Sequence, residues 1–136
     1  MEELIRVTPD KEKARSILKM VEATLEMIRF IDKIKFPSNV AKEYYEIIRE
    51  LISIILLLDG HKAIGEKAHK RQIEYLEANY KEFGQAEITL IDDLRITRNK
   101  IAYEGFFVKE SYVDRKLTDI LKVIEKLKRL IDKKLV

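Results

Sequence analysis

Apolar side chains recur at intervals of three and four residues along most of this chain, a spacing typical of α-helices with one buried face. One such series lies near the beginning of the sequence: Ala14, Leu18, Val21, Leu25 and Ile28. Another runs toward its end: Val113, Leu117, Ile120, Ile124, Leu127 and Ile131. Only four glycines and two prolines occur in 136 residues, so turns are few and elements are long. The sequence therefore predicts an all-α fold.

Turn and capping residues divide the chain into about five helices. Thr8-Pro9-Asp10 combines a capping hydroxyl with a proline at the first helical position, and Asp59-Gly60 ends a helix with a glycine. The predicted helices cover about residues 9–35, 40–58, 66–80, 86–104 and 111–131, with a linker at His61–Gly65. Short connections favour antiparallel neighbours in an up-and-down bundle. Because Leu51–Leu58 is apolar on nearly every side, the second helix is predicted to be the central one.

Length and charge limit the possible functions only loosely. The chain is long enough for one domain with a substantial core, predicted to span residues 1–136. It carries 27 Lys and Arg against 24 Asp and Glu, so its net charge of +3 gives only weak support for nucleic-acid binding. The basic excess from Lys109 onward is interpreted as a solvated helix face.

Features that the sequence lacks exclude several classes of protein. Cysteine is absent, which excludes disulfides, thiolate metal sites and cysteine nucleophiles. Neither a Walker loop nor a glycine-rich dinucleotide turn occurs, so no cofactor is expected. Met1–Thr8 lacks a signal-peptide pattern, and the longest apolar run, Ile54–Leu58, is far shorter than the roughly 20 residues that cross a membrane. We expect a cytoplasmic protein without a membrane partner, and the abundance of Lys, Glu and Ile favours a thermophilic host.

Arg98 is unusual because it falls within the apolar side of the fourth predicted helix. At roughly 100° per residue, one side of that helix collects Ile91, Leu94, Ile101, Ala102 and Gly105 around it. A guanidinium keeps its charge, and burying an unpaired charge is very costly. Arg98 therefore needs an anion. The candidates are an acid of the second helix such as Glu43 or Glu50, an acid of a second subunit, or a ligand phosphate.

The segment Ile91–Gly105 places Asn99 directly after Arg98 and Tyr103 four positions further on. It resembles the signature helix of the HEPN family, in which an arginine and a polar residue are followed after a few positions by a histidine. Arg98 and Asn99 match the first two positions, and Tyr103 stands at the position of the histidine. A second similarity to small archaeal and bacterial HEPN proteins lies upstream, in Tyr44-Tyr45, Leu56–Lys62, His69 and Glu74–Leu76. Together the resemblance covers roughly residues 40 to 125.

The resemblance implies a helical bundle that forms a homodimer, with the motif helices of two subunits meeting at a cleft. Many family members are toxins that cut RNA without a metal, and others bind or regulate small nucleotidyltransferases. In the ribonucleases the arginine stabilises charge on the scissile phosphate, and the histidine transfers a proton. By this resemblance, the candidate catalytic residues are Arg98, Asn99 and Tyr103.

Tyr103 is the main departure from the family motif. A phenol with a pKa near 10 is a poor general base at neutral pH, although it can donate a hydrogen bond to phosphate or stack on a base. Tyr103 also lies about 140° around a regular helix from Arg98. Bringing it together with Arg98 and Asn99 therefore requires a distorted helix end at Gly105 or a second subunit.

We expect a HEPN-like module that binds RNA or a nucleotide with little or no catalysis, pairing with a nucleotidyltransferase partner as in toxin–antitoxin systems. Two alternatives stay open. One is a metal-independent RNA endonuclease that uses Arg98, Asn99 and Tyr103. The other is a structural protein in which Arg98 forms an internal ion pair. His61 and His69, with Glu66 between them, offer too few ligands to predict a metal site.

Overall fold

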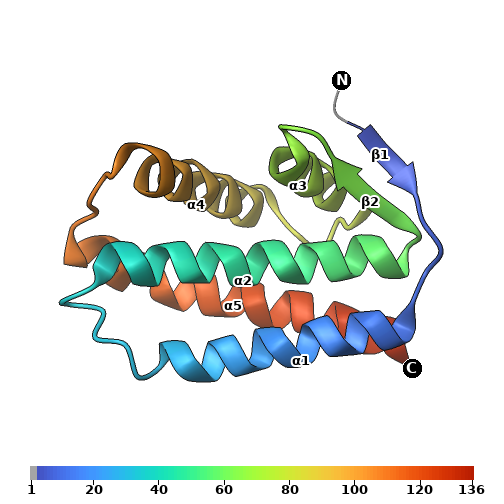
Figure 1. Cartoon of the computed structure of the whole chain (residues 1–136), viewed down its shortest axis with the longest axis horizontal. Coiled ribbons are helices and arrows are strands. Elements are labelled where there is room, and N and C mark those ends of the chain that lie inside the picture. Colours follow the sequence, from blue (N-terminus) through green and yellow to red (C-terminus); the bar gives the residue numbers. More distant parts are fainter. Residues whose placement is uncertain (1–2) are drawn as a thin grey trace.

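The computed structural model describes residues 3–136, which form five helices and a two-stranded sheet (Figure 1). Its elements are β1 (Glu3–Arg6), α1 (Lys11–Ile28), α2 (Pro37–Leu58), β2 (His61–Ile64), α3 (Ala68–Asn79), α4 (Gln85–Glu104) and α5 (Glu110–Leu135). The prediction of an all-α bundle of about five helices is confirmed. Met1 and Glu2, the first residues of the segment Met1–Thr8 considered above, lie outside the described residues. No helix within residues 3–136 is long and apolar enough to cross a membrane.

The helix α2 forms the centre of the bundle, as its apolar second half predicts. Its side chains include some of the most deeply buried in the molecule, each at most 1% exposed: Leu51, Ile52, Ile54, Ile55 and Leu56. The helices α1, α3, α4 and α5 all pack against it (Figure 1). Burying one such side chain contributes about 1.5–3 kcal/mol, so this helix supplies a large part of the core.

The directions of the helices follow from contacts at the two ends of α2. At its start, the Ser38 hydroxyl accepts a hydrogen bond of 2.9 Å from the Val108 amide, which lies just before α5. At its end, the Lys134 ammonium of α5 donates a 2.6 Å bond to Asp59. The helices α2 and α5 therefore run in the same direction. The antiparallel arrangement predicted from the short loops holds for α1 with α2. The helix α5 runs parallel to α2 because α4 runs back in the opposite direction between them (Figure 1).

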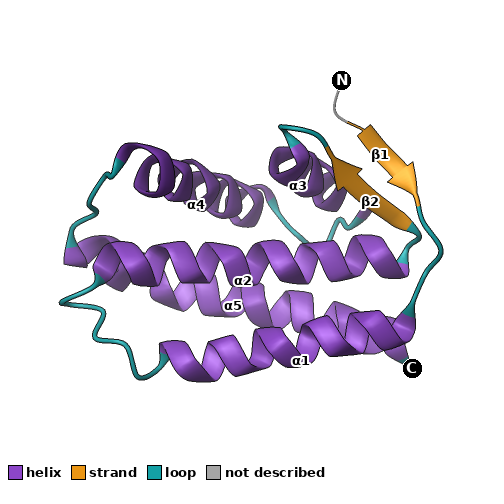
Figure 2. Ribbon diagram, viewed as in Figure 1, coloured by secondary structure: helices purple, strands orange, loops and turns teal. Residues whose placement is uncertain are grey.

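The small sheet corrects the prediction that His61–Gly65 is a linker (Figure 2). Residues His61–Ile64 form the strand β2, which pairs antiparallel with β1 so that Leu4 lies opposite Ala63 and Arg6 opposite His61. A four-residue strand is too short to show a clear alternation, and its partner lies more than fifty residues away in the sequence. The sheet packs beside α2 and α3, and it fixes the position of His61.

The helix α1 ends at Ile28, well before the predicted end near residue 35. The carboxylate of Asp32 explains the difference, because it accepts hydrogen bonds from the amides of Ile34 and Lys35 at 2.9 and 3.1 Å. A side chain bonded in this way to nearby amides competes with the helical pattern and favours a turn. The next helix then starts at Pro37, a residue suited to a first helical position.

Candidate functional site

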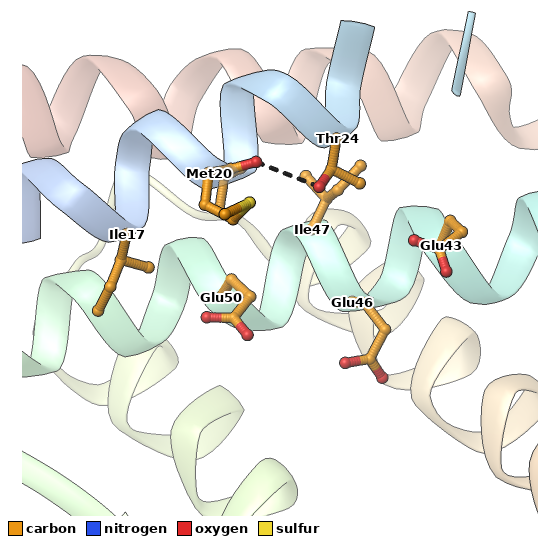
Figure 3. Close-up of a pocket in the computed structure, with 8 residues that line it drawn as sticks. Ile17, Met20, Thr24, Glu43, Glu46, Ile47 and Glu50 are labelled. Carbon is orange, nitrogen blue, oxygen red and sulfur yellow. Dashed lines mark hydrogen bonds between the residues drawn. The ribbon is translucent and has the colours of Figure 1, made fainter. Parts of the chain in front are cut away.

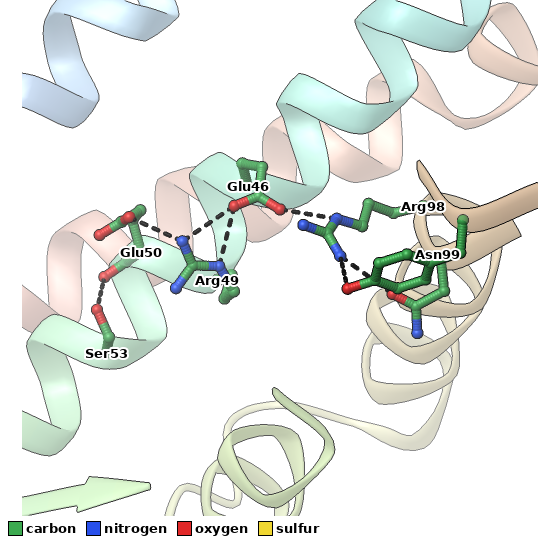
Figure 4. Close-up of polar contacts among 7 residues, drawn as sticks. Glu46, Arg49, Glu50, Ser53, Arg98 and Asn99 are labelled. Carbon is green, nitrogen blue, oxygen red and sulfur yellow. Dashed lines mark hydrogen bonds and ion pairs between the residues drawn. The ribbon is translucent and has the colours of Figure 1, made fainter. Parts of the chain in front are cut away.

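Arg98 finds its anion on the central helix. Its Nε lies 3.0 Å from Oε1 of Glu46 in α2, and the two side chains are only 16% and 25% exposed (Figure 4). Of the three possible partners predicted, a carboxylate of the second helix is present, although it belongs to Glu46 rather than to Glu43 or Glu50. Neither of these two atoms has a well-aligned hydrogen bond within residues 3–136, so their attraction is mainly electrostatic.

The apolar stripe of α4 is shorter than predicted. Ile91 and Leu94 are buried, but Ile101 is only half-buried, and Ala102 and Gly105 are exposed. The second half of α4 thus extends beyond the tightly packed core. Arg98 is therefore placed at the border of the core, where one side of its guanidinium meets Glu46 and the other is turned toward the end of α4.

Arg98, Asn99 and Tyr103 lie together in one subunit. Nη1 of Arg98 donates to Oδ1 of Asn99 at 3.2 Å and to the hydroxyl oxygen of Tyr103 at 3.3 Å, and the guanidinium carbon lies 5.6 Å from the centre of the tyrosine ring. The helix continues to Glu104, and Gly105 closes it with a left-handed φ of 64°. The prediction that a distorted helix end or a second subunit is needed is wrong, because the long arginine side chain spans the gap.

A line of alternating charges connects this group to the rest of α2 (Figure 4). Arg49 contacts Glu46 through Nε at 3.0 Å and Glu50 through Nη2 at 2.9 Å. Glu46 is therefore shared by Arg49 and Arg98. On α4, Nε of Arg95 likewise lies 2.8 Å from a carboxylate oxygen of Asp92. These pairs hold three arginine side chains in fixed positions between α2 and α4, where each stays partly accessible.

A cavity of about 490 Å³ opens between the start of α3 and the second half of α4. We call it the α3–α4 cavity. It is lined by Gly65, Glu66, Lys67, Ala68, His69, Lys70, Arg95, Asn99 and Tyr103. Basic and hydrogen-bonding side chains predominate, with Glu66 the single acid in this lining. Two of the three predicted site residues, Asn99 and Tyr103, face the cavity directly, while Arg98 lies behind them.

Sequence reasoning considered His69 only in the family resemblance and as a metal ligand, and did not place it beside Asn99. It comes from α3, and its ring centre is 6.1 Å from that of Tyr45. Burial lowers the pKa of His69 below its ordinary value of 6.5, and the charge of Arg49 lowers it further, so the imidazole is neutral at pH 7. No stretch of sequence connects His69 with Asn99, which lies thirty residues later. Only the packing of α3 against α4 brings the two to one cavity.

The two histidines do not form a metal centre with their neighbours. Within residues 3–136 no group of three or more His, Asp or Glu side chains is placed to hold a metal ion. His61 instead packs against Tyr75, with ring centres 5.5 Å apart, whereas His69 faces the α3–α4 cavity.

A groove of about 270 Å³ lies on the other side of Glu46, between α1 and α2 (Figure 3). Glu43, Glu46 and Glu50 line it from α2, and Ile17 and Met20 from α1. Three carboxylates disfavour an anion here. The surfaces on the two sides of Glu46 thus differ in charge, and of these two the α3–α4 cavity is the better suited to a phosphate.

Comparisons of the chain with protein-family models, curated proteins and solved structures found no match. The resemblance to the HEPN family accordingly rests on the residues of this chain. The function of this chain is therefore inferred from the chemistry of the α3–α4 cavity.

Proposed function

We propose that this protein binds RNA or a nucleotide through phosphate in the α3–α4 cavity. One observation carries the proposal: Lys70 and His69 of α3 share this cavity with Arg95, Asn99 and Tyr103 of α4. Lysine and arginine attract phosphate oxygens, and an exposed aromatic ring offers a surface on which a base can stack. The Tyr103 side chain suits that second role because the residue is 76% exposed.

In this proposal Arg98 positions other residues rather than meeting the ligand itself. Its bond to Oδ1 of Asn99, a residue that lines the cavity, leaves the amide nitrogen of that side chain available as a donor. Its bond to the Tyr103 oxygen occupies an acceptor site, so the phenolic proton stays available to a phosphate. Glu46 holds the guanidinium in place from behind. Two hydrogen-bond donors are thereby directed at one anion.

The family resemblance extends the proposal to the biological setting. It favours a HEPN-like, weakly catalytic or non-catalytic module that acts as a homodimer and pairs with a nucleotidyltransferase-type protein in a toxin–antitoxin system. Weak catalysis follows from Tyr103, since a phenol keeps its proton at neutral pH and does not act as a general base.

His69 favours a second candidate function, metal-independent RNA cleavage. A neutral imidazole can accept the proton of a ribose hydroxyl, and this one lies in the same cavity as Asn99 and Tyr103. His69 would then take the part that the family motif gives to a histidine on the helix of Arg98. Cleavage of RNA in the presence of a chelator, abolished in His69→Asn, would favour this function over binding alone.

Fluorescence anisotropy with a labelled single-stranded RNA tests binding. We expect Asn99→Ala to weaken binding by about tenfold or more, because a hydrogen bond to a charged group contributes about 1.5–3 kcal/mol. Asn39→Ala is the matched control, since Asn39 is exposed on α2. Arg98→Lys should also weaken binding, because an ammonium cannot hold Asn99 and Tyr103 in the same geometry. Equal binding by Asn99→Ala and Asn39→Ala would contradict the proposal.

A further inference from the structure

The groove of about 270 Å³ between α1 and α2, which we call the α1–α2 groove, has the shape of a seat for another helix (Figure 3). Its lining follows α1 from Ile17 to Thr24 and α2 from Glu43 to Glu50. Seven residues make two helical turns, so the groove is about 10 Å long. Its volume lies below the range of about 300–1,000 Å³ that is common for small-molecule sites. A long, narrow groove of this size suits side chains that project from one face of a helix.

Apolar side chains form the floor of the α1–α2 groove. Ile17, Met20 and Val21 come from α1, and Ile47 comes from α2. Val21 and Ile47 are buried in the core, but Met20 is 69% exposed. Met27, which is 49% exposed, follows seven residues later and therefore lies on the same side of α1. Methionine adapts its shape to what covers it and is common at surfaces that bind other helices.

One wall of the groove is acidic. Glu43, Glu46 and Glu50 line it, and no lysine or arginine does so within residues 3–136. Both oxygens of Glu46 are already engaged, Oε1 by Arg98 and Oε2 by Arg49. Arg49 also binds Oε1 of Glu50, which leaves Oε2 of a side chain that is 39% exposed. Glu43 forms no ion pair in the described part of the chain, so Glu43 and Glu50 have carboxylate oxygens to offer a partner.

The spacing of these two acids indicates what the partner looks like. Glu43 and Glu50 lie two turns apart on one side of α2. A helix that lies along the groove repeats its own side chains with the same period. Basic residues at its positions i and i+7 would meet the two carboxylates, and apolar residues at i+3 and i+4 would lie between them, over Met20 and Ile47. Charge complementarity of this kind selects a basic helix over an acidic one.

We propose that the α1–α2 groove binds a helix of another protein that carries a lysine or arginine at each of two positions seven residues apart, with apolar residues between them. The groove and the α3–α4 cavity share no lining residue. The inference therefore holds whether or not RNA binds in that cavity.

Fluorescence anisotropy with a labelled synthetic helical peptide tests the proposal. The lysine peptide carries Lys at i and i+7 and Leu at i+3 and i+4, and the glutamate peptide has Glu in place of both lysines. Wild-type protein should bind the lysine peptide about tenfold more tightly, or more, and added salt should reduce this preference. Glu43→Gln combined with Glu50→Gln should weaken binding of the lysine peptide about tenfold, because two ion pairs are lost. The control Glu77→Gln, at an exposed position of α3, should leave it unchanged.

A charge exchange separates recognition from damage to the fold. The variant with both Glu43→Lys and Glu50→Lys should bind the glutamate peptide in preference to the lysine peptide, a reversal that unfolding does not produce. Met20→Ala should weaken binding of the lysine peptide about fivefold, since apolar contact is lost.

RNA binding by the variant with Glu43→Gln and Glu50→Gln should equal that of the wild type, so failure at the groove is distinguishable from failure at the α3–α4 cavity. Equal affinity of the wild type for both peptides, or no binding of either, would overturn the proposal. A shift of Met20→Ala toward a monomer in sedimentation velocity would overturn it as well, because it would assign the groove to a second copy of this chain.

Discussion

The position of Arg98 shows how one residue can serve both the fold and a site. Its charge is matched by Glu46, which explains how a guanidinium is accommodated beside the core. Its Nη1 nitrogen arranges Asn99 and Tyr103 at the edge of the cavity. The need for an anion was predictable from the sequence. The identity of the acid was not, because Glu43, Glu46 and Glu50 lie on neighbouring turns of α2 and only packing selects among them.

Tyr103 gives the sharpest prediction at this scale. Wild-type protein should cut RNA slowly or not at all in a chelator, and Tyr103→His should create or strengthen cleavage, because general acid–base assistance contributes roughly 10²–10⁴ in rate. Gel analysis of RNA incubated with wild type, Tyr103→His and Tyr103→Phe checks this. Rapid cleavage by the wild type that disappears in Tyr103→Phe would show that the tyrosine itself takes part in the chemistry.

At the scale of elements, Asp59 connects the end of α2 to α3 and α5. It accepts hydrogen bonds from the hydroxyls of Tyr75 and Tyr80 and from the ammonium of Lys134. Burial raises the pKa of Asp59, but the bonds from Lys134 and the two tyrosines lower it more, to below the ordinary 3.8. A carboxylate whose pKa is lower in the folded than in the unfolded protein stabilises the fold. This stabilisation is fully present at pH values above the pKa that the group has in the unfolded chain. This contribution is lost as the pH falls through the folded pKa.

We therefore expect Asp59→Asn to lower the free energy of unfolding by about 1–3 kcal/mol at neutral pH, since it removes hydrogen bonds to a charged group. The difference from the wild type should begin to shrink as the pH falls below about 4, where Asp59 of the unfolded chain takes up a proton, and be smallest below the lower pKa of folded Asp59. Urea unfolding at several pH values measures both effects, with Asp93→Asn, at an exposed position on α4, as the control. A difference that stays constant down to strongly acidic pH would contradict the role of the charge.

Elements defined by residues close together in the sequence could be predicted, whereas those defined by contacts between distant residues could not. The end of α4 at Gly105 was predicted from a local signal, a glycine able to adopt a left-handed φ. The strand β2 was not, because its partner β1 is distant in the sequence. The early end of α1 depends on one carboxylate, that of Asp32, which the apolar spacing does not reveal. His69 became a site residue only through the packing of α3 beside α4.

At the scale of the whole molecule, the loops after α1 and α4 lie at the same end of the bundle (Figure 1), and exposed phenylalanines lie on or next to both. Phe30 and Phe107 are 86% and 84% exposed, and Phe36 and Phe106 are about half as exposed. The bond between Ser38, in the first turn of α2, and Val108 holds the loop after α4 next to the start of α2. Apolar groups that gather on a surface often mark an interface.

We expect this end, together with the second half of α4, to form the proposed homodimer and to bury at least about 1,200 Å² in total. Phe107→Asp should shift the protein toward a monomer in sedimentation velocity, whereas Met20→Asp, at an exposed position of α1, should not. A wild-type protein that sediments only as a monomer at micromolar concentration would contradict the dimer.

Phosphate-bearing RNA should enter the α3–α4 cavity, and nuclear magnetic resonance tests this binding most directly. Titration of labelled protein with a short single-stranded RNA should shift the side-chain amide of Asn99 and the ring signals of His69. The side-chain amide of Asn39, at an exposed position of α2, should stay in place. Shifts confined to other surfaces, or no shift of Asn99 and His69 at saturating RNA, would contradict the account.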